Sequence, residues 1–105
     1  MSDKRKHVRR PLVIEARFQD RFGKIIKGSV SDISMGGANI VTSHPLNPDT
    51  PLNLALDVVD FGMIVDVHCR VVRVKPGEAM GVKFASDSNR EVATILECIK
   101  PKEGA

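Results

Sequence analysis

The sequence predicts an all-β fold with one C-terminal helix, a six-stranded antiparallel barrel forming a single domain. Two observations support the strands: apolar and polar residues alternate in short stretches up to residue 84, and Gly, Pro and Asp gather between these stretches. After that point the apolar residues recur every three or four positions, which is typical of an amphipathic helix. Six short strands and one helix fit a small barrel with the helix packed across it.

The first three predicted strands cover residues 12–18, 24–33 and 38–42. In residues 12–18 the even positions are apolar, and Glu15 and Arg17 fall on the other face, as in a half-buried strand. Asp20-Arg21-Phe22-Gly23 predicts a turn before the second strand. Ser34-Met35-Gly36-Gly37 interrupts the pattern between the second and third strands.

The other three strands are predicted at residues 52–58, 63–75 and 80–84. Residues 44–51 hold three of the six prolines and predict a loop, because proline cannot donate to a central ladder. Within residues 63–75 the apolar positions are odd up to Val71 and then shift to Val72 and Val74. This slip predicts a β-bulge near Val71 and Val72, which would bend the strand as a small barrel requires.

A helix is predicted over about residues 89–100, with the apolar positions Val92, Ile95, Leu96 and Ile99. Ser88 and Glu91 have the spacing of a capping box at its start. Pro101 would end it. The predicted organisation is a flexible basic arm in residues 1–10, a barrel domain in residues 11–100 and a short tail in residues 101–105.

Composition favours a small globular protein with a local anion-binding feature. The 105 residues are 42% hydrophobic, enough for one core. The net charge of +3 is unevenly spread, since residues 4–10 carry five cations and no acid: Lys4, Arg5, Lys6, Arg9 and Arg10. The two cysteines, Cys69 and Cys98, have no metal-like spacing and predict buried free thiols. We expect a cytoplasmic protein without membrane insertion, as no leader or spanning stretch is evident.

Catalysis is not predicted. The histidines at positions 7, 44 and 68 have no partner at triad or ligand spacing, and no pair of carboxylates suggests acid and base chemistry. Ser34 has no general base nearby in the sequence. His68 is out of phase with Val67 and Cys69, so it faces either solvent or a ligand groove, and an ordinary surface histidine is the simpler interpretation.

Two short patterns together predict a guanine-nucleotide site. Asp32 and Ser34 lie two apart, on one side of a strand, and Gly36-Gly37 forms either a plain turn or a point of close approach by a backbone or ligand. Arg5 and Arg9 are four residues apart, and each guanidinium suits a phosphate or the O6/N7 edge of guanine. A carboxylate complements the N1–H and N2–H₂ donors on guanine's other edge.

These residues resemble the motifs of the PilZ domain family, bacterial receptors for cyclic di-GMP. The family's R-x-x-x-R motif corresponds to Arg5-Lys-His-Val-Arg9, and its [D/N]-x-S-x-x-G motif to Asp32-Ile-Ser-Met-Gly-Gly37. Further similarities, which extend the resemblance over nearly the whole chain, are Arg10-Pro11, Ala38-Asn39-Ile40, Arg70-Val-Val-Arg73 and Gly81-Val-Lys-Phe84.

The resemblance implies a split β-barrel over which the arm folds when cyclic di-GMP binds. Arg5 and Arg9 would then hold guanine and phosphate, with Arg10 as a further phosphate contact. Asp32 and Ser34 would hold a guanine edge. The remaining implied site residues are Gly36 and Gly37 at the point of close approach, and His68 and Arg73 in the wall of the site.

The implied protein needs no cofactor besides this ligand and acts as a stand-alone adaptor that changes conformation and signals to an unidentified effector protein. Two alternatives remain open. The chain could be a family member that has lost the ligand and serves only as an interaction module. It could also be a β-barrel that binds nucleic acid through its basic arm. Nucleic acid is the less favoured partner because the chain has no Trp or Tyr to stack on bases.

Overall fold

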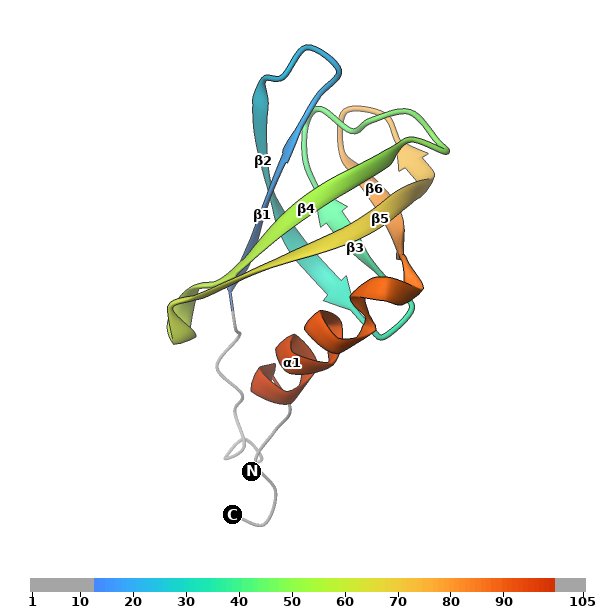
Figure 1. Cartoon of the computed structure of the whole chain (residues 1–105). Helices are drawn as coiled ribbons and strands as arrows, with labels where there is room; N and C mark the ends of the chain where they lie inside the picture. Colours follow the sequence, from blue (N-terminus) through green and yellow to red (C-terminus); the bar gives the residue numbers. More distant parts are fainter. Residues whose placement is uncertain (1–12, 100–105) are drawn as a thin grey trace, which may run out of the picture.

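The structure, a computed structural model, describes residues 13–99 and confirms a six-stranded antiparallel barrel with one C-terminal helix (Figure 1). The strands run around the barrel in the order β1-β2-β3-β6-β5-β4, and β1 also pairs with β4, which closes it. The elements are β1 (Ile14–Gln19), β2 (Ile25–Ile33), β3 (Gly37–Val41), β4 (Pro51–Val58), η2 (Val59–Phe61), β5 (Met63–Lys75), β6 (Ala79–Phe84), η3 (Ser86–Ser88) and α1 (Asn89–Ile99).

Alternate residues of the strands fill the barrel, as the sequence pattern predicted. Ala16, Ile40 and Leu56, from three different strands, are each 0% exposed. α1 adds Val92 and Ile95 to the same core, also fully buried. This helix covers the end of the barrel at which β6 finishes, as Figure 1 shows below the strands. Burial of the helix face supplies most of the energy that holds an 11-residue helix in place.

Two β-bulges change which side chains face outward. The predicted bulge in β5 is confirmed by a register shift between Val71 and Arg73, opposite β6. A second shift lies in β2 between Val30 and Asp32, opposite β3, and the sequence analysis did not predict it. Beside each bulge two consecutive residues are exposed instead of one, so Asp32 and Arg73 both project from the outer surface.

The turn between β1 and β2 has the chemistry that its sequence predicted. Asp20 Oδ1 accepts the N–H groups of Phe22 at 2.8 Å and of Lys24 at 2.9 Å. Gly23 takes φ of 81°, in the left-handed region that favours glycine. The result is a rigid connection whose tip projects beyond the barrel (Figure 1).

Pro51 was predicted to be loop and is instead the first residue of β4, paired with Arg70 of β5. On its other side β4 pairs with β1 only from Ala55 onward. Pro51 therefore lies where β4 has a free edge, and the missing N–H removes no ladder bond there.

The predicted capping box at α1 is wrong. Ser88 belongs to η3, and its Oγ accepts the backbone N–H of His68 at 2.8 Å rather than one from α1. The Oε1 of Glu91 is buried and has no hydrogen-bond partner within the described part of the chain. The 3₁₀ turn itself satisfies the first donors, because Ser88 N–H bonds to Ala85 O and Asn89 N–H to Ser86 O.

Both cysteines are free, but only Cys69 is fully buried, and Cys98 on α1 is half-buried. Burial raises the pKa of the Cys69 thiol to about 12, so this group stays protonated near neutral pH and is a poor nucleophile. Between residues 13 and 99, α1 is too short to cross a membrane and no other helix could do so.

Candidate functional site

The turn from Ser34 to Gly37 is held by its own serine. Ser34 N–H donates to Gly37 O at 2.8 Å, and Gly36 N–H donates to Ser34 Oγ at 3.3 Å. The hydroxyl itself reaches Gly37 O at 3.5 Å. Ser34 remains exposed, so its Oγ both shapes the turn and can still bind a ligand from outside.

The two glycines of this turn differ in their surroundings. A Cβ on Gly37 would overlap Val82 O in β6, so this glycine permits close contact between the backbones of β3 and β6. A Cβ on Gly36 would meet nothing within 4 Å. The close approach that the sequence suggested is therefore one of strand against strand at Gly37, while Gly36 borders open space.

A row of outward-facing residues crosses four strands at the level of the two bulges. Asp32 of β2 is in register with Asn39 of β3, Asn39 with Gly81 of β6, and Gly81 with Arg73 of β5. Neighbouring strands are about 4.8 Å apart, so the row is about 15 Å long. The structure thus places two predicted site residues, Asp32 and Arg73, on one surface of the barrel.

In the middle of this row, the side chains of Arg73 and Asn39 lie over the space between Asp32 and Arg73. A Cβ on Gly81 would lie 3.0 Å from Cζ of Arg73, so the guanidinium of Arg73 lies directly over this glycine. Its side chain thus extends along the row toward Asn39. Asn39 Nδ2 in turn donates to Ser31 Oγ at 2.9 Å, which orients the amide next to Asp32.

The adjacent row holds two more exposed cations, Lys83 of β6 and Arg70 of β5. Lys83 is in register with Gly37 of β3 on one side and with Arg70 on the other. A depression of about 830 Å³ on this surface is lined by Asn39, Arg73 and Gly81 among others. The surface therefore combines the Asp32 carboxylate, one amide and several cations beside the Ser34–Gly37 turn, and Glu78 adds a second carboxylate at the depression.

His68 is not part of this row. Its Nδ1 lies 3.3 Å from Asp87 Oδ2, and its backbone N–H donates to Ser88 Oγ. The residue also borders a larger groove, which adjoins the depression beside Arg73 at Ser43, Val74 and Gly77. Arg5, Arg9 and Arg10 lie outside the described residues, so their predicted roles stay predictions.

Sequence reasoning missed Asn39 and Gly81 as site residues, although both lie in stretches that resembled the family. The signal for Asn39 was its place between buried Ala38 and Ile40, which turns its amide outward. Gly81 has no such signal, because only the pairing of β5 with β6 reveals that Arg73 lies over it. Residues 13–99 contain no group of three or more His, Cys, Asp or Glu that could hold a metal ion.

Comparisons with known proteins agree with this architecture. The solved PilZ domain of YcgR from Escherichia coli, with c-di-GMP, has a TM-score of 0.68 at 11% identity and covers 89% of this chain and 92% of that chain. The PilZ domain of CeSA from a cellulose-synthesizing bacterium has a TM-score of 0.60 at 22% identity, covering 86% and 92%.

MrkH from K. pneumonia, solved in its apo state, also has a TM-score of 0.60 at 22% identity. The match covers 94% of this chain but only 51% of MrkH, so this chain corresponds to about half of that protein. A comparison with curated proteins finds no match. The family profile described as PilZ domain matches residues 3–100, and the chain therefore belongs to the PilZ domain family.

Proposed function

We propose that this protein binds cyclic di-GMP on the outer surface of the barrel, across β2, β3, β6 and β5. The observation that carries the proposal is the register row from Asp32 through Asn39 and Gly81 to Arg73, beside the Ser34–Gly37 turn. Membership of the PilZ domain family and the likeness to a PilZ domain solved with c-di-GMP support it.

The chemistry of the row suits a guanine nucleotide. The Asp32 carboxylate accepts hydrogen bonds from guanine N1–H and N2–H₂, and Ser34 Oγ is a neighbouring donor and acceptor. The Arg73 guanidinium can stack on a base or pair with a phosphate. In this proposal Arg5 and Arg9 of the N-terminal segment supply the remaining contacts to guanine and phosphate, and Arg10 assists.

Binding couples to signalling through the N-terminal segment. Five positive charges in residues 4–10 repel one another, and the two phosphates of the ligand neutralise part of that charge as the segment closes on the barrel. The closed surface is then available to an effector protein. In this role the protein is a cytoplasmic adaptor and not an enzyme, and cyclic di-GMP is a ligand rather than a cofactor.

Isothermal titration calorimetry with cyclic di-GMP tests the proposal. We expect Asp32→Ala and Arg9→Ala to weaken binding at least about tenfold, which corresponds to about 1.4 kcal/mol. Asp60→Ala is the matched control, because Asp60 is an exposed aspartate in η2 outside the row. No binding by the unchanged protein would instead favour an interaction module without ligand.

Titration at different salt concentrations, with DNA as a second ligand, distinguishes this proposal from the nucleic-acid alternative. A protein that binds DNA or RNA through its basic segment would show a steep salt dependence and no preference for cyclic di-GMP over duplex or single-stranded DNA. Equal affinities of the Asp32→Ala and Asp60→Ala variants for cyclic di-GMP would overturn the proposed site.

A further inference from the structure

The hairpin formed by β1 and β2 carries cations without acidic partners. Residues 17–27 hold four cations and one acid: Arg17, Arg21, Lys24 and Lys27 against Asp20. Among the described residues, the ion pairs are His68–Asp87 and Lys75–Glu78, and neither involves this hairpin. Asp20 is already engaged with backbone N–H groups of its turn.

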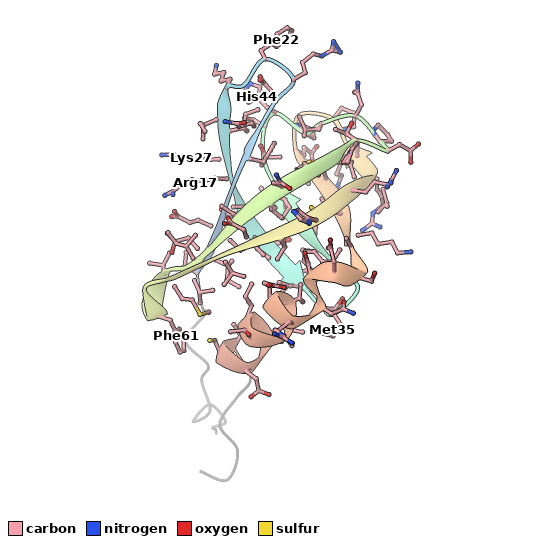
Figure 2. The ribbon with its side chains drawn as sticks, in the orientation of Figure 1. Arg17, Phe22, Lys27, Met35, His44 and Phe61 are labelled. Atoms are coloured by element: carbon pink, nitrogen blue, oxygen red, sulfur yellow. The ribbon has the colours of Figure 1, made fainter. Side chains whose placement is uncertain are left out.

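Two of these cations are placed against each other. Arg17 and Lys27 are directly opposite across β1 and β2, and Figure 2 shows both side chains projecting to the same side. Like charges at directly opposite positions destabilise a sheet. The arrangement therefore lowers the stability of the free hairpin, and an anionic partner would relieve the repulsion.

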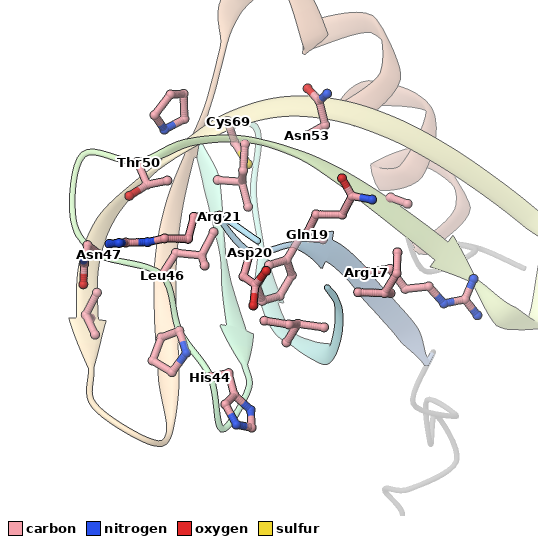
Figure 3. Close-up of a pocket in the computed structure, with 18 of the residues that line it drawn as sticks. Arg17, Gln19, Asp20, Arg21, His44, Leu46, Asn47, Thr50, Asn53 and Cys69 are labelled. Carbon is pink, nitrogen blue, oxygen red and sulfur yellow. The ribbon is translucent and has the colours of Figure 1, made fainter. Parts of the chain in front are cut away.

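An open groove lies beside the hairpin (Figure 3). The pairing of β1 with β4 ends at Arg17 and Ala55, although β1 continues to Gln19 and β4 extends back to Pro51. The strands separate there, and the resulting groove has a volume of about 1280 Å³. Its apolar lining includes Phe18, Leu46 and Leu52. Its charged lining comprises Arg17 and Arg21 on the hairpin, Asp20 in the turn and Asp66 on β5.

The exposed apolar residues of the hairpin extend this surface. Phe22 at the tip is 84% exposed and Ile25 is 56% exposed, and both line the same groove. Phe22 projects from the end of the molecule in Figure 2. The Arg21 guanidinium lies over the Phe22 ring, 5.6 Å from its centroid. Clustered exposed apolar residues mark interaction surfaces, and the excess of cations over acids on the hairpin favours a partner of negative charge.

We propose that this groove and hairpin bind an extended acidic segment of a partner protein. Its carboxylates would pair with Arg17 and Lys27, and its apolar side chains would enter the groove near Leu46 and Leu52. The concave apolar floor suits side chains better than a flat lipid surface or a phosphate backbone. The groove also exceeds the usual range for a small-molecule pocket, about 300 to 1,000 Å³.

The inference goes beyond the proposed binding of cyclic di-GMP and does not rest on it. Asp32 lies near the end of β2, whereas Lys27 and the groove lie near its beginning. Lys27 and Asp32 are five residues apart, so about 17 Å separates them along the strand. The groove and the depression beside Arg73 meet at Ser43, Val74 and Gly77, which line both. The charged contacts of the partner, at Arg17 and Lys27, are therefore distinct from the nucleotide contact at Asp32.

Fluorescence anisotropy with short labelled peptides and the full chain tests the proposal. The probe alternates glutamate with leucine and phenylalanine. One control peptide has lysine for glutamate, and another has serine for the apolar residues. We expect binding of the first peptide only, weakened by salt. Lys27→Glu should weaken it about five- to tenfold, whereas Arg90→Glu, which reverses an exposed charge on α1, should not.

The direction of the stability change separates docking from a structural role. Lys27→Glu places a carboxylate opposite Arg17, so it should raise the melting temperature while it weakens peptide binding. Loss of binding together with a lowered melting temperature would contradict the proposal. Ser34→Ala should keep full peptide affinity, so a failure of cyclic di-GMP binding would leave this result intact.

Several outcomes would overturn the inference. The acidic peptide could fail to bind, or the lysine peptide could bind equally well. Binding to phosphatidylglycerol vesicles or to duplex DNA without binding to the acidic peptide would assign the hairpin to a lipid surface or to nucleic acid. Concentration-dependent dimerisation that Phe22→Ser abolishes, with no peptide binding, would assign the groove to a second copy of this chain.

Discussion

Two regions of the barrel surface, the row across its outer face and the β1–β2 hairpin at its open end, differ in how their exposed groups are supported. Around the row from Asp32 to Arg73, polar groups are held by neighbours: Asn39 bonds to Ser31, Ser34 bonds within its turn, and Arg73 lies over Gly81. At the hairpin end, the cations form no ion pair with an acid of residues 13–99, and apolar side chains are exposed. The first arrangement suits a small rigid ligand, because its groups are already in place. The second suits a polypeptide that supplies what the surface lacks.

The two ends of the barrel also differ in how tightly their side chains are packed. α1 closes one end with Val92 and Ile95, while the other end opens into the groove of about 1280 Å³. Stability should therefore depend on the closed end and tolerate changes at the open one. The predictions that follow test this contrast, from the largest expected effect to the smallest.

Ile95→Ala should have the largest effect. Ile95 is 0% exposed, so its truncation leaves a cavity in the core and should lower the free energy of unfolding by about 2–4 kcal/mol in urea denaturation. Phe22→Ala at the open end is the control, and it should change the free energy of unfolding by less than about 0.5 kcal/mol. A similar loss from both variants would mean that the hairpin end is as tightly packed as the helix end.

Gly37→Ala should lower the free energy of unfolding by about 2 kcal/mol, because the added Cβ meets Val82 O across β3 and β6. Gly36→Ala is matched in chemistry and adjacent in sequence, yet its Cβ enters open space, so its effect should be close to zero. Equal effects in urea denaturation would show that the contact with β6 does not explain the glycine at position 37.

Gly81→Ala should act on binding more than on stability. Its Cβ would displace the flexible Arg73 guanidinium and lower the affinity for cyclic di-GMP about three- to tenfold, measured by calorimetry. Arg73→Ala should have a similar effect. The double variant should be no worse than either alone, because both changes remove the same contact. Additive losses would mean that the two residues act separately.

Lys27→Glu should have the smallest effect, raising the free energy of unfolding by about 0.2–1 kcal/mol through a new cross-strand pair with Arg17. Lys27→Gln should give a smaller gain, since it removes repulsion without adding attraction. Both gains should shrink at high salt. A loss of stability in Lys27→Glu would show that Arg17 and Lys27 do not repel each other in the folded protein.

Most of the fold was predictable because alternation reports directly which residues face the core. The six strands and the bulge near Val71 and Val72 were predicted from that pattern. The bulge in β2 was missed although the sequence marks it, because Val30 and Ile33 are three positions apart with Ser31 and Asp32 between them, and the apolar parity changes there as it does in β5. The capping box failed because Ser88 bonds to His68, a residue of a distant strand.

The sequence by itself determined the alternation that builds the barrel, the helix that follows, and the motif residues by which the family is recognised. Only the tertiary structure decided that Asp32, Asn39, Gly81 and Arg73 form one row, that Gly37 is constrained by β6, and that Arg17 opposes Lys27. The physical reason is that strand register is set by pairing between segments far apart in the chain. Periodicity fixes which face a side chain takes, but not which side chain lies beside it.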